Sequence, residues 1–359
     1  MLNVRDLRAL PFALPLKGSL KWGLGDELRA LEHVLIRVEL SDGSIGIAEA
    51  TPRPSIYGET QASILAIVEA HLAPLLIGAG LETFQCVADL SKGMDGIKNN
   101  NTAKGATDMA LHQALCRANG TTLAQHLGAA RPRIRLSYIV STGAADEVLA
   151  DVDGAYRAGL RAFKVKIGKD IASETQTLRA LLARFPAAQF YVDANQTLEE
   201  ASAAGILDGL HELGVVHCEE PLPVENIRAR QALRRQCSMP IIADDSTFTL
   251  PDLHRELDYD TFDILNIKTA RSGFSASRAM LQACANAGKE VMVGSQASSL
   301  LGCLHAATFA AQTAVSCASE CSFFLKTAAD LSLAPAIRDG WLSLAEAGAA
   351  LDRLIEATL

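Results

Sequence analysis

The sequence predicts a parallel β/α barrel that follows a smaller α+β domain, and the main evidence is a repeat in the second part of the chain. Apolar runs there end in charged residues at steps of 27, 26, 25 and 24 residues, marked by Lys166, Asp193, Glu219, Asp244 and Lys268. A buried strand, a loop and a helix use about that many residues, so the repeat indicates successive parallel βα units. The 359 residues also exceed the roughly 250 of one barrel, which leaves room for a second domain.

The N-terminal part, residues 1–130, is expected to be the α+β domain. Alternating apolar runs on either side of Ser41-Asp42-Gly43 predict an antiparallel hairpin. Further along, apolar residues recur every three or four positions, so helices should pack on the hairpin sheet. The predicted strands cover residues 33–40 and 44–50, and the predicted helices lie within 59–77 and 102–118.

The barrel is expected over residues 131–325, with helices between the strands. Those helices are predicted over residues 173–185, 198–213, 226–237 and 275–288. Three more apolar runs, one before Lys166 and two after Lys268, bring the number of strands to eight: residues 134–140, 290–296 and 314–320. The tail, residues 326–359, holds a short strand, a turn and a helix that we expect to pack back on the first domain.

Composition and charge exclude several classes of protein. A net charge of −8 and a pI near 5.5, with scattered Lys and Arg, argue against a nucleic-acid partner. The N-terminus is interrupted by charges and no 18-residue apolar run exists, so we expect neither a signal peptide nor a membrane span. Eight cysteines stand singly, without C-x-x-C pairs, which is typical of reduced core thiols. A cytoplasmic protein is expected.

Three of the markers are carboxylates at the ends of consecutive predicted strands. The carboxyl ends of parallel barrel strands face one pocket, so Asp193, Glu219 and Asp244 should converge. Three hard oxygen donors suit Mg²⁺, with Mn²⁺ as a substitute, and no His or Cys at matching positions points to zinc. Helix caps or surface ion pairs are the plainer explanation, but the common phase of the three residues favours a metal site.

Lysines flank the predicted metal site on two sides. Lys164 and Lys166 are two residues apart on one strand and therefore point the same way, while Lys268 enters from a strand across the barrel. Like charges lower each other's pKa, so these lysines are candidate bases, unless they only neutralise the carboxylates. Bases on both faces of a metal-held carboxylate suggest removal and return of a proton on the adjacent carbon, through an enediolate.

The motif series resembles that of the enolase superfamily, and within it the muconate lactonizing enzyme (muconate cycloisomerase) subgroup. The similarity covers nearly the whole chain, and it implies a (β/α)7β TIM-like barrel with an α+β capping domain that the C-terminal tail completes. The segments that carry it are Lys164-Val-Lys166, Asp193-Ala-Asn195, Glu219-Glu220-Pro221, Ala243-Asp244-Asp245-Ser246, Lys268-Thr-Ala-Arg271, Tyr57-Gly-Glu-Thr60 and residues 103–111.

The resemblance implies a role for each matched residue. Asp193, Glu219 and Asp244 would bind Mg²⁺, and Lys166 and Lys268 would be the acid/base pair. Lys164 would adjust the pKa of Lys166 and contact the carboxylate of a small substrate. The other residues expected to contact the substrate are Asn195, Gln296, Glu320, Lys17 and Tyr57. Asp245 and Arg271 would support the catalytic residues without touching the substrate. Members of the family are commonly octamers or dimers, so a homo-oligomer is expected.

Three positions depart from the usual pattern of the family. Asp245 stands where a Glu is usual, Gln296-Ala-Ser-Ser299 replaces Met-x-Glu-Ser, and Glu320-Cys-Ser322 replaces the Asp-x-Asp of dipeptide epimerases. Glu320 instead matches the Glu of the Gly-Thr-Glu-Leu motif that is usual in cycloisomerases at this position. A muconate-like diacid is therefore the first expected substrate. Its second acid group would contact Lys17, Lys21 or Arg53, which lie in two predicted loops at residues 16–25 and 51–58. These loops are either lids over the active site or ordinary surface turns.

Other functions stay open. Racemisation or epimerisation of N-substituted amino acids, dipeptides or amino-acid betaines needs the same two lysines, and dehydration of a β-hydroxy acid passes through the same enolate. A protein that kept the fold but lost catalysis is the remote alternative.

Overall fold

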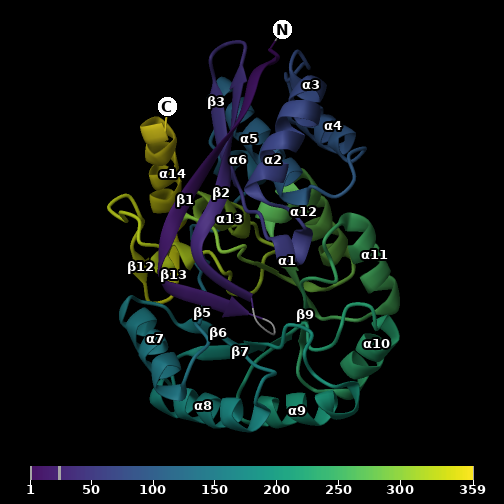
Figure 1. Ribbon diagram of the computed structural model, residues 1–359, viewed down its shortest axis with the longest axis vertical. Coiled ribbons are helices and arrows are strands. Elements are labelled where there is room, and N and C mark those ends of the chain that lie inside the picture. Colours follow the sequence, from purple (N-terminus) through teal and green to yellow (C-terminus); the bar gives the residue numbers. More distant parts are fainter. Residues whose placement is uncertain (1, 23–25, 359) are drawn as a thin grey trace.

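The computed structural model describes residues 2–22 and 26–358 of the chain and has two parts (Figure 1). The upper part in Figure 1, which we call the cap, comprises the elements from β1 to α6. The lower part is a parallel sheet wrapped by helices. Among the described residues, no helix combines the length and the apolar character needed to cross a bilayer.

The cap is built on a three-stranded antiparallel sheet in the order β1-β2-β3, with β1 at Val4–Trp22, β2 at Asp26–Leu40 and β3 at Ile45–Ala50. The β2–β3 pair matches the predicted hairpin. The expectation of a loop over residues 16–25 was wrong, because β1 continues to Trp22 and pairs again with β2 from Leu20 onward; residues 23–25 lie outside the described part. Pro11 and Pro15 fit in β1 because it is an edge strand.

The cap helices cover one side of this sheet. They are α1 (Pro54–Tyr57), α2 (Gln61–Ile67), a π-helical turn η1 (Val68–Leu72), α3 (Ala73–Leu76), α4 (Phe84–Met94), α5 (Asn101–Ala118) and α6 (Leu123–Leu127). Helix α5 is buried along most of its length and packs on β2 and β3 on one side and on helix α12 (Thr269–Asn286) on the other. It therefore joins the cap to the barrel.

Small residues allow α5 to approach both neighbours closely. A Cβ on Gly46 of β3 would lie 2.0 Å from the carbonyl oxygen of Ala110, and one on Gly105 would lie 3.0 Å from the carbonyl oxygen of Arg271. Asp108 of α5 accepts hydrogen bonds from the backbone N–H groups of Phe274 and Ser275, just after a break in α12. The cap is thus fixed to the barrel by backbone contact as well as by apolar packing.

The barrel sheet has seven parallel strands in the order β11-β10-β9-β8-β7-β6-β5. Their bounds are β5 Tyr138–Ile139, β6 Ala162–Lys166, β7 Gln189–Asp193, β8 Cys218–Glu219, β9 Ile241–Ala243, β10 Ile264–Ile267 and β11 Glu290–Val293. Besides α12, the surrounding helices are α7 Ala145–Arg157, α8 Ile171–Arg184, α9 Glu200–Glu212, α10 Ile227–Gln236, α11 Leu250–Tyr259 and α13 Leu300–Ala310. The predicted helices agree with these to within a few residues, except that α12 begins before residue 275.

The eighth predicted strand, residues 314–320, is not a regular strand. Its backbone nevertheless hydrogen-bonds to both edges of the sheet. The N–H groups of Cys317 and Glu320 donate to carbonyls of β11, while Ser319 donates to Arg135 and forms a parallel bridge with Leu136. A turn at Thr313–Ala314 and a bend at Cys317 interrupt the segment, so hydrogen bonds rather than a full strand close the ring.

The tail contacts both parts of the molecule. Strands β12 (Ile337–Arg338) and β13 (Trp341–Ser343) form a small sheet with β4 (Arg133–Arg135), and helix α14 (Leu344–Thr358) packs on α13. A short 3-10 turn, η2 (Phe323–Lys326), leads into this tail. Just after η2, Thr327 bridges Leu16 and Ala328 donates to the carbonyl of Pro15, both in β1.

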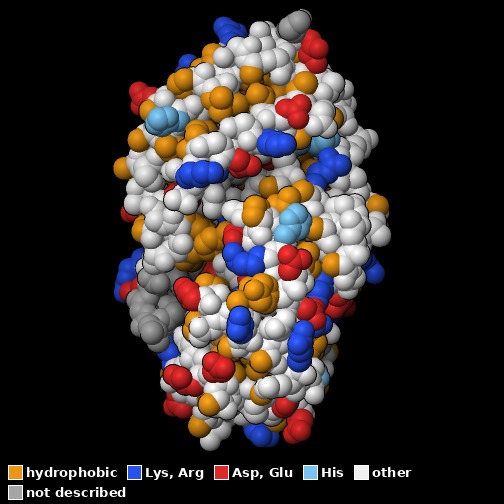
Figure 2. Space-filling view, turned by 90° about the vertical axis from the view of Figure 1, so that its right-hand side faces the viewer, with side chains coloured by type: hydrophobic (Ala, Val, Ile, Leu, Met, Phe, Trp, Pro, Cys, Tyr) orange, Lys and Arg blue, Asp and Glu red, His pale blue; other side chains and the backbone are white. Residues whose placement is uncertain are grey.

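The surface is hollowed where the cap meets the barrel. A hollow of about 560 Å³ lies between α4, the start of α5, residues 248–251 and α12. Figure 2 views the side of the molecule that carries α11 and α12 and shows charged side chains of both signs scattered over it.

Replacing Gly46 with Ala tests the close packing of β3 on α5. The added methyl group would overlap the backbone of Ala110, so we expect a loss of about 1–3 kcal/mol in the free energy of unfolding, measured with denaturant. In the control Gly93→Ala, on an open face of α4, stability should be unchanged or slightly higher. Equal stability of the two variants would contradict the packing argument.

Acid should weaken the fold through buried histidines, of which His305 of α13 is the best placed for a test. Burial lowers the pKa of His305 to about 4, and its Nδ1 has no hydrogen-bond partner among the residues that the structure describes. An unfolded histidine titrates near 6.5, so between these values only the unfolded state binds the proton, and stability falls as the pH falls below 6.5, by about 2 kcal/mol at pH 5.

The variant His305→Leu should therefore show a smaller drop in Tm between pH 7.5 and pH 5 than the parent protein does. The exposed His71→Leu serves as the control and should keep the full drop. If His305→Leu also keeps it, the acid sensitivity has another source.

Candidate active site

Four of the five charged residues at the strand ends line one cavity, and the fifth, Glu219, contacts Lys164 of the cavity wall. Strand register places Lys166 beside Asp193 and Asp193 beside Glu219, and Asp244 follows directly after β9. The cavity measures about 230 Å³ and is lined by Arg53, Ser55, Ile56, Ile139, Lys164, Lys166, Asp193, Asn195, Gln196, Asp244, Asp245, Lys268, Ser295, Gln296 and Ala297. Parallel strands bring these residues together, as their spacing predicted.

Lys164 is buried among three carboxylates. Its Nζ lies 2.6 Å from Glu219 Oε1, 3.0 Å from Asp193 Oδ2 and 3.0 Å from Glu320 Oε1. Burial alone would lower the pKa of Lys164, but the three carboxylates raise it well above its usual value. The expectation that neighbouring lysines lower this pKa was wrong, because carboxylates separate them, and Lys164 is a fixed positive charge in this arrangement.

Lys166 is the more accessible of the two lysines on β6. Its Nζ donates to Asp193 Oδ2 at 2.5 Å and to Asn195 Oδ1 at 2.8 Å, and 14% of its side chain is exposed. Asn195 has a left-handed backbone, with φ of 43°, which turns the chain at the end of β7. This turn brings the Asn195 amide over the ammonium group, so Lys166 faces the cavity with two oxygen partners.

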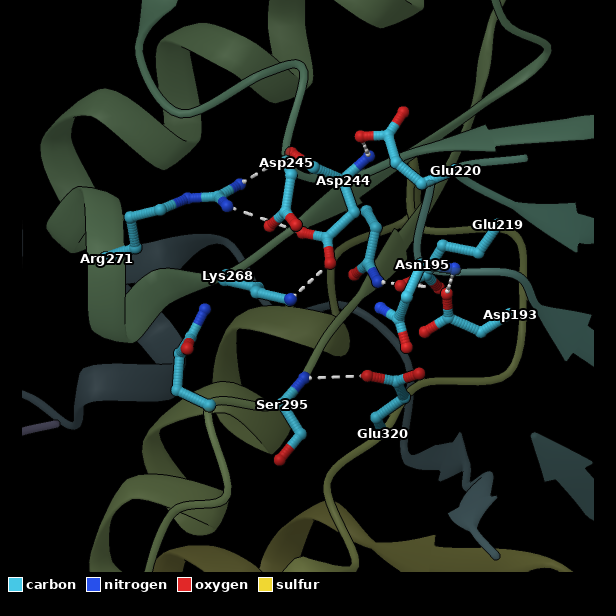
Figure 3. Close-up of polar contacts among 12 residues, drawn as sticks. Asp193, Asn195, Glu219, Glu220, Asp244, Asp245, Lys268, Arg271, Ser295 and Glu320 are labelled. Atoms are coloured by element: carbon cyan, nitrogen blue, oxygen red, sulfur yellow. Dashed lines mark hydrogen bonds and ion pairs between the residues drawn. The ribbon is translucent and has the colours of Figure 1, made fainter. Parts of the chain in front are cut away.

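Lys268 occupies the other side of the cavity, at the end of β10. Its Nζ donates to Asp244 Oδ2, and the guanidinium of Arg271 donates to Asp244 Oδ1 at 3.3 Å (Figure 3). Burial tends to raise the pKa of Asp244, but these two cations lower it to about 2. Asp244 therefore stays ionised, and in the sheet order the strands β7, β8 and β9 lie between Lys268 and Lys166.

The three marker carboxylates are each turned toward a lysine. In the described part of the chain, no three His, Cys, Asp or Glu side chains are already gathered as a metal site. The donor chemistry nevertheless fits a hard divalent cation, since Asp193, Glu219 and Asp244 are carboxylates on adjacent strands. Burial and the nearby carboxylates raise the pKa of Glu219 well above its usual value, although Lys164 acts in the opposite direction.

Glu220, the middle residue of the Glu219-Glu220-Pro221 motif, has a structural role that the motif did not predict. It turns away from the cavity with φ of 39° and accepts hydrogen bonds from Ser246 N at 2.7 Å and Ser246 Oγ at 3.0 Å (Figure 3 shows its bond to the Asp244 backbone). Burial raises the pKa of Glu220 to about 8. Glu220 therefore holds the loop that carries Asp244 in place. The only signal of this role in the sequence was its position next to Glu219.

Of the other predicted site residues, some lie at the cavity and others lie away from it. Glu320 lies beneath the cavity, where it accepts from Tyr191 OH and Ser295 N, both at 2.9 Å, and Asp245 accepts from Gln196. The Gln296 amide donates to the hydroxyl of Tyr57 from the cap. Lys17 is not among the cavity-lining residues; its exposed Nζ donates to Leu325 O, while the side chain of Lys21 lies outside the described part.

Two family models match the chain over most of its length. Residues 27–128 match the mandelate racemase / muconate lactonizing enzyme N-terminal domain, and residues 147–350 match the enolase C-terminal domain-like family.

Curated and solved relatives are similar over nearly the whole chain. The L-Ala-D/L-Glu epimerase of Bacillus subtilis (strain 168) is 30% identical over 84% of this chain and 82% of its own. The structure of muconate lactonizing enzyme from Mycobacterium smegmatis complexed with muconolactone has 33% identity and a TM-score of 0.90, covering 95% of this chain and 94% of that one.

A dipeptide epimerase structure from Cytophaga hutchinsonii, complexed with Mg and the dipeptide D-Ala-L-Val, has 26% identity and a TM-score of 0.83, covering 91% and 89% of the two chains. These relatives are isomerases, and the resemblance noted in the motifs is confirmed. The chain belongs to the mandelate racemase/muconate lactonizing enzyme family of the enolase superfamily and is an isomerase of that superfamily.

Proposed function

We propose that this protein is a Mg²⁺-dependent epimerase that inverts the carbon next to the carboxylate of an N-acylated amino acid, such as the C-terminal residue of a dipeptide. The observation that carries the proposal is the pair Lys166 and Lys268, which line one cavity from β6 and β10 with three strands between them. Inversion needs one group to remove a proton from one face of the carbon and another to return it on the opposite face.

The chain's own residues divide this work. Lys166 and Lys268 exchange a proton with the α-carbon from opposite faces, each acting as base for one stereoisomer and as acid for the other. Lys164, held protonated by its three carboxylates, adds positive charge beside the substrate carboxylate. Charge that develops on that carboxylate is thereby stabilised in a buried site, where electrostatic interactions are strong.

Asp193, Glu219 and Asp244 are the residues proposed to hold the metal. A bound divalent cation would supply positive charge to the substrate carboxylate and so make the neighbouring proton more acidic. It would also compensate the carboxylates around Glu219. Asn266, whose amide donates to Glu219 Oε2 at 3.2 Å, orients that carboxylate.

Epimerisation replaces cycloisomerisation of a muconate-like acid as the preferred reaction. Support comes from the names of the relatives, since both the Bacillus subtilis and the Cytophaga hutchinsonii proteins are epimerases. Cycloisomerisation stays the second candidate, because the Mycobacterium smegmatis muconate lactonizing enzyme is 33% identical over 95% of the chain. Both reactions use a proton on the carbon next to a carboxylate. The proposal also takes the protein to be a homo-oligomer that acts on small molecules.

The first test is proton NMR of the Mg²⁺-loaded protein in D₂O with dipeptides, N-succinyl amino acids, proline betaine and cis,cis-muconate. Deuterium should appear at the α-carbon of a dipeptide or an N-acyl amino acid, together with its epimer. Deuterated muconolactone would favour the second candidate instead, and no reaction with any compound would contradict both.

Variants of the two lysines test the division of work. In Lys166→Ala and in Lys268→Ala, epimerisation should fall by at least about 100-fold, because each removes one acid/base group. Each variant should still exchange the α-proton of one stereoisomer, and the two should differ in which one. Lys92→Ala, on the exposed surface of α4, is the control. Equal loss of exchange from both stereoisomers in both variants would argue against opposed bases.

Removal of the metal provides a further test. A chelator should abolish exchange, and Mg²⁺ or Mn²⁺ should restore it. Calorimetry should show Mg²⁺ binding to the parent protein, and Glu219→Gln should bind it at least about tenfold more weakly, since one of three carboxylate donors is lost. Asp42→Asn, in an exposed turn of the cap, should bind as the parent does. Exchange that persists in excess chelator would refute the metal requirement.

A further inference from the structure

A second cluster of reactive side chains lies beside the β5–α7 loop, and the proposed function gives none of its members a role. Lys326, the last residue of η2, donates to Ser141 Oγ at 2.6 Å and to Asp151 Oδ2 of α7 at 3.0 Å. Lys326 and Ser141 are 185 residues apart in the chain, so closure of the barrel brings them together. A hydroxyl, an amine and a carboxylate linked in this order match a nucleophile, its base and the group that orients the base.

An aromatic ring and a carboxylate hold Lys326 beside the hydroxyl. Its Nζ lies 4.5 Å from the ring centre of Tyr138, and the hydroxyl of Tyr138 donates to Asp151 Oδ1 at 2.7 Å. Asp151 also accepts from the backbone N–H of Ser141 at 2.7 Å, so one carboxylate positions both the amine and the nucleophile. Burial lowers the pKa of Lys326, although Asp151 acts in the opposite direction. Lys326 therefore gives up its proton, as a base must, more readily than an exposed lysine does.

Ser141 lines a cavity of about 410 Å³, next to the cavity of about 230 Å³ that holds the opposed lysines. The two cavities share Lys166 and Asn195 and otherwise have different walls. A volume of this size is typical of sites for small organic ligands. Much of the wall is apolar and accepts a short hydrocarbon chain; the apolar lining residues are Ala144, Ala145, Val148, Val165, Ile167 and Ala194.

Two backbone N–H groups beside Ser141 suit the oxygen of a reacting carbonyl. Thr142 and Gly143 both line the cavity, and neither N–H has a hydrogen-bond acceptor among the residues that the structure describes. The N–H groups on either side, of Ser141 and Ala144, donate to carboxylates. Thr142 and Gly143 also precede α7, whose N-terminal end favours negative charge. N–H groups placed in this way stabilise the charge that develops on a carbonyl oxygen during acyl transfer.

We propose that Ser141 and Lys326 form a second catalytic site, which hydrolyses esters of short apolar carboxylic acids through an acyl-serine intermediate. As Ser141 Oγ bonds to the carbonyl carbon, its proton passes to the neutral amine of Lys326. The resulting ammonium group gives this proton to the departing alcohol oxygen as the ester bond breaks. Water then attacks the acyl-serine; its proton passes to Lys326 and on to Ser141 Oγ, which leaves as the hydroxyl. The products are the acid and the alcohol.

Hydrolysis of p-nitrophenyl butanoate by the full chain tests this inference. The parent protein should release p-nitrophenol at least about tenfold faster than buffer does. The rate should be the same with Mg²⁺ and with excess chelator, because none of the proposed metal ligands belongs to this cluster. A fluorophosphonate probe should label Ser141, which mass spectrometry of the peptides locates. A rate equal to that of buffer, with no label on Ser141, overturns the inference.

Two variants assign the nucleophile and the base. Ser141→Ala should lower hydrolysis by at least about 100-fold and abolish the label, since the attacking oxygen is lost. Lys326→Arg keeps a cation beside Asp151 but cannot release its proton, so hydrolysis should again fall by at least about 100-fold. Ser202→Ala, which removes an exposed hydroxyl of α9, is the control and should match the parent. Circular dichroism checks that each variant is folded; if Lys326→Arg does not fold, Ser141→Ala and the label still decide.

The other outcomes are equally distinct. Unchanged hydrolysis in Ser141→Ala, or a label on another residue, overturns the inference because the nucleophile then lies elsewhere. Unchanged hydrolysis in Lys326→Arg also overturns it, because the lysine is then only a structural cation. None of these measurements involves exchange of an α-proton, so the inference can fail while the proposed epimerase function stands, and the reverse also holds.

Discussion

The barrel mouth depends on the ion pairs of Lys164. This buried ammonium joins β6 to β7 through Asp193, to β8 through Glu219 and to the irregular eighth segment through Glu320. Removing one partner of such a cluster leaves an uncompensated buried charge, which is strongly destabilising. The position of the neighbouring Lys166 depends on this cluster, because both lysines project from one short strand and both contact Asp193. Lys164, Lys166 and Asp193 of this cluster also form one wall of the reaction cavity.

Much of the barrel could be predicted because its sequence is periodic. Evenly spaced markers reveal parallel strands, and parallel strands bring their ends together, so the convergence of Lys166, Asp193, Glu219, Asp244 and Lys268 followed from the spacing alone. The eighth strand was predicted as regular because residues 314–320 are apolar like the others. Hydrogen bonds to both neighbours, which no pattern reveals, hold it in place without strand geometry.

Contacts between distant segments were beyond the sequence. The chain from Glu49 through His33 and Arg53 to Gln296 joins two strands and a loop of the cap to a loop of the barrel, and none of these residues is close to the others in a repeat. The continuation of β1 to Trp22 was missed because glycines there suggested a loop, whereas pairing with β2 decides the conformation. The direction of the Lys164 pKa was also missed, since it depends on where three carboxylates lie.

The cap and the barrel are one unit for catalysis. Helix α5 is wedged between the cap sheet and α12, with glycines at both contacts, so a rigid swing of the whole cap would break backbone packing. Motion that admits substrate must therefore be local to the segments around the cavity.

Closure of the ring at residues 314–320 has an evolutionary consequence. Backbone groups supply most of the hydrogen bonds of this closure, and among the side chains of residues 316–318 Ser316 adds one, accepting from Val291 N at 3.4 Å. Sequence change can accumulate there with little loss of stability, while Glu320, which is tied to Lys164 and Tyr191, is constrained. Selection can thus act on this segment almost independently of selection on the fold.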